Sequence, residues 1–234
     1  MSDTIASGVL ITRPEPAATE TARMLQARGF ETVLAPMLLV QPHQWPAAQP
    51  RAQAILVTSA NALQAATACD RDTPVLAVGD ATAARAAACG FMHVASAGKD
   101  AVALMALAAA RLDPAAGALL LASGAGLGLD LAADLRKLGF RVIRRVAYSA
   151  TAARELPAPA MAALASGQIR HAMFFSAASA RAFVACITAP DTMLREVEAL
   201  AISAPTARAL APLPWRRIRV ASHPNLDELV ALLP

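Results

Sequence analysis

The chain carries two copies of one sequence pattern, and this repeat limits the folds that it can adopt. Three pairs of segments match: MLQARGFETV at 24–33 with DLRKLGFRVI at 134–143, AILVTSANALQA at 54–65 with AMFFSAASARAF at 172–183, and LAVGDATAARA at 76–86 with LAISAPTARAL at 200–210. In the first pair, Gly29 and Gly139 each follow a helical segment at the position that favours a left-handed residue. The pattern indicates a duplicated fold.

Short apolar runs of strand length alternate with Ala-rich helical segments through both copies. The predicted strands are 8–12, 32–35, 54–57, 75–78 and 92–95, followed by 118–122, 141–146, 172–175, 199–202 and 217–221. Strands that alternate with helical segments of about 10 to 15 residues are typical of parallel sheets covered by helices. The sequence therefore predicts an α/β fold with two similar doubly wound parallel sheets. Its 234 residues suit two domains of roughly 100 residues each.

Composition argues against a membrane protein, although 56% of the residues are hydrophobic. The apolar run AVALMALAAA at 101–110 is far shorter than the roughly 20 residues that a membrane span needs. The amino terminus, MSDTIASG, has neither a basic region nor an apolar segment. We therefore expect no signal peptide, no contact with a membrane and a cytoplasmic location.

The charge of the chain favours a small anionic ligand over a nucleic acid. Net charge is +4, but the basic residues are spread along the sequence. The tightest cluster is Arg216, Arg217 and Arg219, which the alternation of a strand would divide between two faces. Nucleic-acid grooves combine a basic stripe with stacking aromatics, whereas only 4% of this chain is aromatic. We expect no nucleic-acid partner.

Cysteine and histidine spacing predicts neither a metal site nor a disulfide framework. Three cysteines lack a CxxC pair, and four histidines lack HxH or HxxxH spacing. These residues are Cys69, Cys89, Cys186, His43, His93, His171 and His223. We expect no metal and no organic cofactor.

Small hydroxyl residues recur just after predicted strands and just before predicted helices. They are Thr58, Ser59, Thr82, Ser176, Ser179 and Thr206. Turns at the carboxyl ends of parallel strands line the crevice where ligands bind, and free N–H groups at helix starts bind carboxylate or phosphate. Each residue taken singly also suits a helix N-cap. Their recurrence at equivalent turns of both copies favours a ligand site.

Two other functions are compatible with parts of the sequence. The segment GAGLG, with Gly124, Gly126 and Gly128, is similar to a dinucleotide-binding fingerprint and suggests an NAD(P)-dependent enzyme. It lacks the third glycine in place, and the next strand carries Arg144 and Arg145 where NAD binding needs an acid. A two-lobed protein that closes on an anionic ligand without catalysis would have nearly the same architecture.

Five motifs in order resemble the uroporphyrinogen-III synthase family. They are VLITRPEPAATETARMLQARGF, ILVTSANAL, VLAVGDATA, FFSAASARAF and AISAPTARAL, and the resemblance runs from Val9 to about Leu233. It implies two similar flavodoxin-like domains joined by two extended linkers. One domain would combine residues 1–36 and 152–234, and residues 37–151 would form the other. Strand counting alone also allows two contiguous halves divided near residue 112.

The resemblance implies a lyase of tetrapyrrole and heme biosynthesis that needs no cofactor and acts in the cleft between its domains. The substrate would be hydroxymethylbilane, a linear tetrapyrrole that bears acetate and propionate groups. The enzyme would release water from the terminal hydroxymethyl group, invert the last ring and close the macrocycle to uroporphyrinogen III, mainly by orienting the reacting ends. We expect a monomer that makes transient contact with the enzyme that supplies hydroxymethylbilane.

The resemblance also suggests roles for individual residues. Tyr148, the only tyrosine, lies where the family places a tyrosine that assists departure of the hydroxyl, as a phenol donor can. The alternative is a ring packed between the domains. Arg13 suits a bidentate contact with a substrate carboxylate, or a local salt bridge.

The other substrate-binding candidates lie at the same turns. They are Thr58, Ser59, Asn61, Gly79, Thr82, Ser123, Gly124, Ser176, Ser179 and Thr206. Ser123 stands where many family members carry an arginine. The missing charge would be absent or supplied from elsewhere, such as by Arg154 or Arg181.

Overall fold

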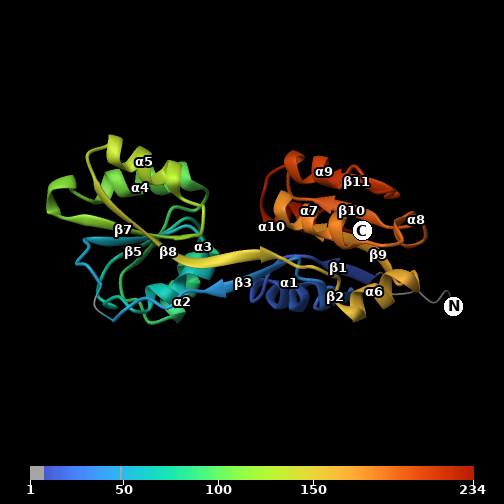
Figure 1. Ribbon diagram of the computed structural model, residues 1–234. Helices are drawn as coiled ribbons and strands as arrows, with labels where there is room; N and C mark the ends of the chain where they lie inside the picture. Colours follow the sequence, from blue (N-terminus) through green and yellow to red (C-terminus); the bar gives the residue numbers. More distant parts are fainter. Residues whose placement is uncertain (1–7, 48) are drawn as a thin grey trace. The chain divides into compact units, whose positions relative to one another are not determined.

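The computed structural model describes residues 8–47 and 49–234, which form two units (Figure 1). One unit joins the described residues up to Leu39 with Thr151–Pro234, and the other is Val40–Ala150. Each contains a sheet of mainly parallel strands with helices on both faces, as the alternation of strands and helices predicts. Within the described residues, no helix is both long and apolar enough to cross a bilayer.

The first unit has a sheet of parallel strands in the order β11-β10-β9-β1-β2. The strands are β1 (Gly8–Ile11), β2 (Glu31–Leu34), β9 (Ile169–Phe174), β10 (Glu198–Ala201) and β11 (Arg217–Val220). The helices are α1 (Ala17–Gln26), α6 (Ala158–Ala165), α7 (Ala177–Cys186), α8 (Pro190–Met193), α9 (Ala204–Leu210) and α10 (Leu226–Val230). Because strand side chains alternate, Leu10 and Phe174 pack with α6, α7 and α9, whereas Ile11 and Met173 pack with α1 and α10.

The second unit has a sheet in the order β3-β8-β7-β4-β5-β6. Its strands are β3 (Leu38–Pro42), β4 (Ala54–Val57), β5 (Val75–Ala77), β6 (Val94–Ser96), β7 (Ala118–Gly124) and β8 (Arg141–Ala152). Its helices are η1 (Ala60–Ala62), α2 (Leu63–Ala66), α3 (Asp80–Ala88), α4 (Ala101–Arg111), η2 (Pro114–Ala116) and α5 (Leu129–Lys137). Val57 and Leu120 pack with α2 and α3, whereas Leu56 and Leu121 pack with α4 and α5 on the other face.

The two sheets have the same strand order once the sequence repeat is followed. The repeat matches β1 and β2 with β7 and β8, and β9, β10 and β11 with β4, β5 and β6. Substituting each strand of β2-β1-β9-β10-β11 by its counterpart gives β8-β7-β4-β5-β6, which is the observed order. In each sheet this is the flavodoxin order. The chain is thus a tandem repeat in which the first two strands of each copy share a sheet with the last three strands of the other copy, joined by the pairs β1 with β9 and β7 with β4.

This exchange rules out sheets built from contiguous halves, because β1 lies between β2 and β9 and pairs with both. The exchange leaves the local structure of each copy unchanged, including the glycine that ends the helix before β2 and before β8. Gly29 and Gly139 both have φ of +89°, the left-handed conformation expected at these helix ends.

The segments expected to be extended linkers take part in strand pairing. Residues 38–42 form β3, and β8 continues beyond the predicted end at 146 as far as Ala152. Backbone hydrogen bonds from His43 N to Ala147 O (2.8 Å) and from Ala153 N to Met37 O (3.0 Å) run in opposite order along the two segments, as in an antiparallel pair. Pairing satisfies backbone groups that a single extended linker would leave to water.

Candidate active site

A β-bulge determines which face of the sheet Tyr148 occupies. β7 and β8 pair in step as far as Ser123 with Val146, but the next pair is Gly124 with Tyr148, which leaves Ala147 as the extra residue. Side chains alternate along a strand, so without the bulge the tyrosine would lie on the opposite face. As it stands, Tyr148 is 6% exposed and packs in the same cluster as Val57 and Leu120. The ring packs within its own unit.

Gly124 provides the space for the Tyr148 ring. A Cβ atom at Gly124 would lie 2.8 Å from Cζ and 3.0 Å from Oη of Tyr148, closer than side chains tolerate. The phenol oxygen forms no hydrogen bond with any residue in 8–47 or 49–234, and it is not among the fully buried atoms that lack a partner there. Its O–H group is therefore free to donate to a ligand at the carboxyl end of β7.

Two further turns of the second unit follow β4 and β5. Ser59 caps η1, because its Oγ accepts a hydrogen bond from Asn61 N (3.3 Å), and Thr58 precedes it at the end of β4. Gly79 is the N-cap residue just before α3 and has no side chain to cap the helix, so the first N–H groups of α3 are left to a ligand or water. Thr82 lies in the first turn of α3 and is 8% exposed. Since β8, β7, β4 and β5 are neighbours in the sheet, these residues share one edge with Tyr148.

The guanidinium beside Ser123 belongs to Arg144. Ser123 is fully buried, and its Oγ accepts a hydrogen bond from Arg144 Nη1 at 3.3 Å. The arginines suggested from the sequence, Arg154 and Arg181, belong to the first unit, where Arg154 lines an apolar cavity of about 620 Å³. Sequence reasoning missed Arg144 as a site residue. The adjacent pair Arg144 and Arg145 was the only signal that pointed to it.

In the first unit, two pairs of hydroxyls mark the starts of α7 and α9. Ser176 caps α7: its Oγ accepts from Ser179 N at 3.0 Å and lies 3.0 Å from Ser179 Oγ. Ser203 and Thr206 repeat the hydroxyl contact at 3.0 Å at the start of α9, and Ser203 was not identified from the sequence. Ser179 and Thr206 are buried, which favours an internal structural role for these two side chains. The turns themselves lie at the carboxyl ends of β9 and β10.

Arg13 follows β1 and is held by local contacts. Its Nη1 donates to Thr21 Oγ1 (3.0 Å), and its guanidinium carbon lies 4.6 Å from the centre of the Phe175 ring. Burial lowers the pKa of Arg13, and the charge of Glu20 opposes that shift. Arginine nonetheless stays charged at neutral pH. Its unused N–H groups are the ones that suit a carboxylate.

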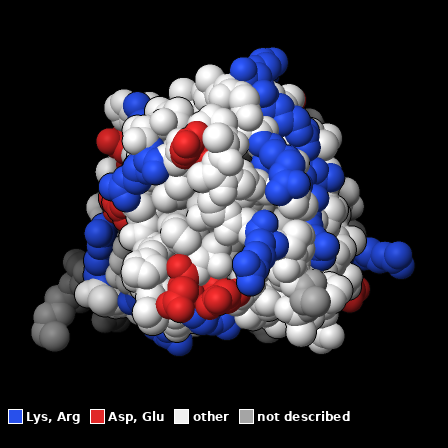
Figure 2. Space-filling model, turned by 90° about the vertical axis from the view of Figure 1, so that its left-hand side faces the viewer, with Lys and Arg blue, Asp and Glu red and all other residues white. Residues whose placement is uncertain are grey.

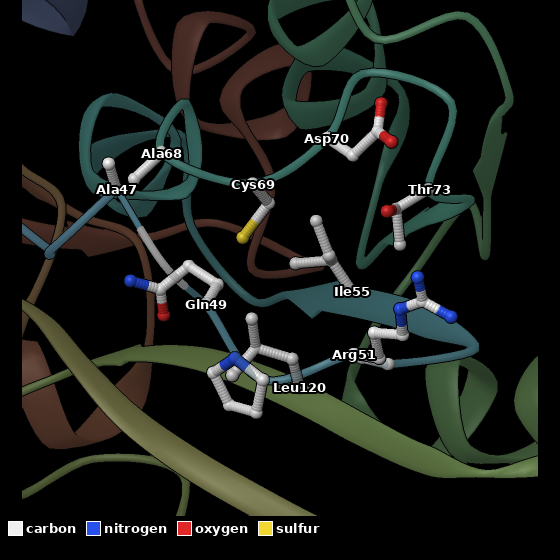
Figure 3. Close-up of a pocket in the computed structure, with 11 residues that line it drawn as sticks. Ala47, Gln49, Arg51, Ile55, Ala68, Cys69, Asp70, Thr73 and Leu120 are labelled. Atoms are coloured by element: carbon white, nitrogen blue, oxygen red, sulfur yellow. The ribbon is translucent and has the colours of Figure 1, made fainter.

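A separate cavity of about 460 Å³ lies at the other end of the strands in the second unit (Figure 3). It is lined by the segments that lead into β4 and β5, and the Cys69 sulfur points into it beside Ile55. Burial raises the pKa of the Cys69 thiol, while Arg71 and Arg145 lower it. The cavity contains none of the predicted site residues. Among the described residues, His, Cys, Asp and Glu nowhere form a group of three that suits a metal ion.

Charges on the face shown in Figure 2 are mixed. Basic side chains run from the top down the right-hand half of this face, others lie at its left edge, and acidic groups lie near its upper centre and lower part.

The family model for uroporphyrinogen-III synthase HemD (HEM4) matches residues 19–231. The chain belongs to the uroporphyrinogen-III synthase family. Solved structures with a similar fold include uroporphyrinogen-III synthetase from Helicobacter pylori, with 16% identity, a TM-score of 0.62 and 97% of each chain covered. A mutant uroporphyrinogen III synthase from Thermus thermophilus has 19% identity and a TM-score of 0.51, covering 97% of this chain and 96% of its own. No curated protein sequence matches the chain.

Membership of this family decides between the three functions that the sequence allowed. It favours a synthase over an NAD(P)-dependent enzyme and over a binding protein without catalysis. Gly124 at the end of β7 and Gly128 in the turn after it have structural explanations of their own, since Gly124 accommodates Tyr148 and Gly128 adopts a left-handed φ of +75° against Ser123.

Proposed function

We propose that this protein converts hydroxymethylbilane to uroporphyrinogen III, a lyase reaction of tetrapyrrole and heme biosynthesis. The family match over residues 19–231 carries the proposal. The phenol of Tyr148 at the carboxyl edge of the second sheet supports it, because this group has no hydrogen-bond partner among the described residues and the reaction needs a donor to a leaving hydroxyl.

The reaction needs little from the protein beyond correct positioning of the two reacting ends of the substrate. The bond between the terminal methylene carbon and its hydroxyl breaks, and the oxygen leaves as water after gaining a proton. The remaining azafulvene-type cation is attacked by the α-carbon of the last ring that already carries the neighbouring methylene bridge. The bond from that carbon to the bridge then breaks, and the bridge bonds to the other α-carbon of the ring, which loses its proton, so that the macrocycle closes with the last ring inverted. Tyr148 donates a hydrogen bond to the departing oxygen. Holding the ends of the chain at bonding distance supplies most of the acceleration.

Carboxylates of the substrate need donors, and the turns provide them. The uncapped first N–H groups of α3 behind Gly79 and the side chains of Thr58, Ser59, Asn61 and Thr82 are the donors in the second unit. In the first unit, the turns at Arg13, at Ser176 and Ser179, and at Thr206 have the same role. Backbone N–H groups bind acetate and propionate without the entropy cost of ordering long side chains.

The direct test is consumption of freshly prepared hydroxymethylbilane by protein that has been stripped of small molecules and treated with a chelator. We expect undiminished turnover, because no metal or organic cofactor is needed. Loss of activity that a divalent ion restores would contradict this mechanism. A monomeric state, a cytoplasmic location and transient contact with the enzyme that makes hydroxymethylbilane stay predictions.

A further inference from the structure

Arg144 is a charged residue that the chemistry above does not use, and it is held at the carboxyl edge of the second sheet. Its backbone lies opposite Leu121 of β7, but its side chain extends toward the end of that strand. Nη1 donates to Ser123 Oγ (3.3 Å) and to Leu127 O (3.1 Å), in the turn that joins β7 to α5.

The charge of Arg144 has no counterion in the described part of the chain. Both acceptors are neutral, and no Asp or Glu of residues 8–47 or 49–234 lies within 4 Å of its guanidinium, Asp130 at the start of α5 included. A guanidinium has five N–H donors in a planar fork, and only those of Nη1 are engaged. The open edge of the fork has the geometry that binds a carboxylate through two parallel hydrogen bonds.

The surroundings of Arg144 form a preorganised unit. Gly128 is left-handed, and a Cβ atom there would lie 3.0 Å from Ser123 Cβ, so the turn packs directly on the buried serine. The same turn begins with Gly124, against which Tyr148 packs. Arg144 is thereby fixed relative to the phenol by two adjacent strands. Arg145, the next residue, points to the opposite face by strand alternation and influences Cys69 instead.

We propose that Arg144 binds a carboxylate of the tetrapyrrole substrate through the open edge of its guanidinium. The proposal rests on the proposed function. Ser123 and Leu127 O act as positioning groups that aim the fork, and a buried serine in this place is what lets the arginine of the neighbouring strand reach the edge.

The test compares Arg144→Gln, Arg144→Lys and Ser123→Ala with the matched control Arg141→Gln. Arg141 is an exposed residue of the same strand, opposite Ala118 at the other end of β7. Hydrogen bonds to charged groups are worth enough that Arg144→Gln should raise KM for hydroxymethylbilane about 10- to 100-fold. The value of kcat should change little, because this contact stabilises the bound substrate and the transition state equally, and losing such a contact raises KM without changing kcat.

A second measurement does not depend on turnover. Anaerobic titration with uroporphyrinogen III should show a similar loss of affinity in Arg144→Gln, a smaller loss in Arg144→Lys and in Ser123→Ala, and none in Arg141→Gln. Unchanged KM and product affinity in Arg144→Gln would overturn the proposal, as would an equal loss in Arg141→Gln. If Arg144→Gln does not fold, Arg144→Lys is the deciding variant. A wild-type KM in Arg144→Lys would show that the two parallel hydrogen bonds of the guanidinium are not needed, and would overturn the proposal. Wild-type protein that forms no III isomer refutes the proposed function itself.

Discussion

Tyr148 occupies its place because of two small neighbours in the sheet. Ala147 bulges from β8 and turns the tyrosine to the face of Gly124, and Gly124 leaves room for the ring. The residue could be singled out from the sequence because it is the only tyrosine and matches a family position. The bulge could not be predicted from the sequence, because it depends on how β7 and β8 pair and no residue pattern in β8 marks it.

Replacing the phenol tests its role without disturbing the ring. Tyr148→Phe should slow formation of the III isomer by about ten- to a thousandfold, or up to about 4 kcal/mol of barrier. Thermal unfolding should be unchanged, since the hydroxyl has no hydrogen-bond partner among the described residues. Product should shift toward isomer I, which free hydroxymethylbilane forms by closing without inversion. A wild-type rate and isomer ratio would assign Tyr148 to packing alone.

His171 of β9 is expected to make stability depend on pH. Burial lowers its pKa, Glu198 opposes this shift, and Arg219 and Arg216 add to it. The unfolded chain therefore binds a proton more readily than the folded one, and stability falls as pH drops through and below about 6.5. Urea midpoints at pH 7.5 and 5.5 should differ more in the wild type than in His171→Gln. The same substitution at the exposed His223 is the control and should leave the pH dependence close to that of the wild type. An equal pH dependence in the wild type and in His171→Gln would refute the role of His171 in it.

At the scale of elements, each predicted strand has a counterpart in the structure, and the signal is clearest for β1, β4, β5 and β7, which are buried along their whole length and read as apolar runs. β3 was missed since LLVQP lies between prolines and is mostly exposed at a sheet edge. The carboxyl-terminal end of β8 was missed for a related reason: Tyr148–Thr151 is polar, and its strand structure depends on pairing with another segment. Edge pairing of this kind leaves little trace in hydropathy.

The contribution of a helix N-cap to stability can also be tested at this scale. Ser176 before α7 and Ser203 before α9 form a matched pair, because each contacts a hydroxyl three residues later. Ser176 Oγ accepts from Ser179 N, whereas Ser203 makes no such bond to the start of α9. Ser176→Ala should lower the free energy of unfolding by about 1 kcal/mol, and Ser203→Ala by less. Chemical denaturation measures both. Equal losses would mean that the cap hydrogen bond contributes nothing beyond the hydroxyl contact that both serines share.

At the scale of the whole molecule, the repeat in sequence and the units in space do not coincide. The sequence shows two contiguous copies, but β1 of the first copy pairs with β9 of the second, and β7 of the second copy pairs with β4 of the first. Local patterns are identical for exchanged and unexchanged copies, so hydropathy and repeats predict the strands and leave their partners open. The family resemblance suggested the exchange, and the strand order shows it.

The exchange predicts which fragments fold. Residues 40–150 include β7, whose every residue is buried, beside its neighbours β4 and β8, and they should unfold cooperatively in urea. Residues 1–112 contain one complete sequence copy but lack β7, so β4 would lose a central partner and no cooperative transition should appear. Circular dichroism during denaturation distinguishes the two. A stable 1–112 fragment beside an unfolded 40–150 fragment would contradict the proposed division into domains.

The central claim is that this protein directs ring closure of hydroxymethylbilane to the inverted product. The measurement is the ratio of uroporphyrinogen isomers formed from fresh hydroxymethylbilane, followed over time at several protein concentrations. We predict that isomer III dominates and that its initial rate rises in proportion to protein, while isomer I falls correspondingly. Formation of isomer I alone, at the rate seen without protein, would contradict the account.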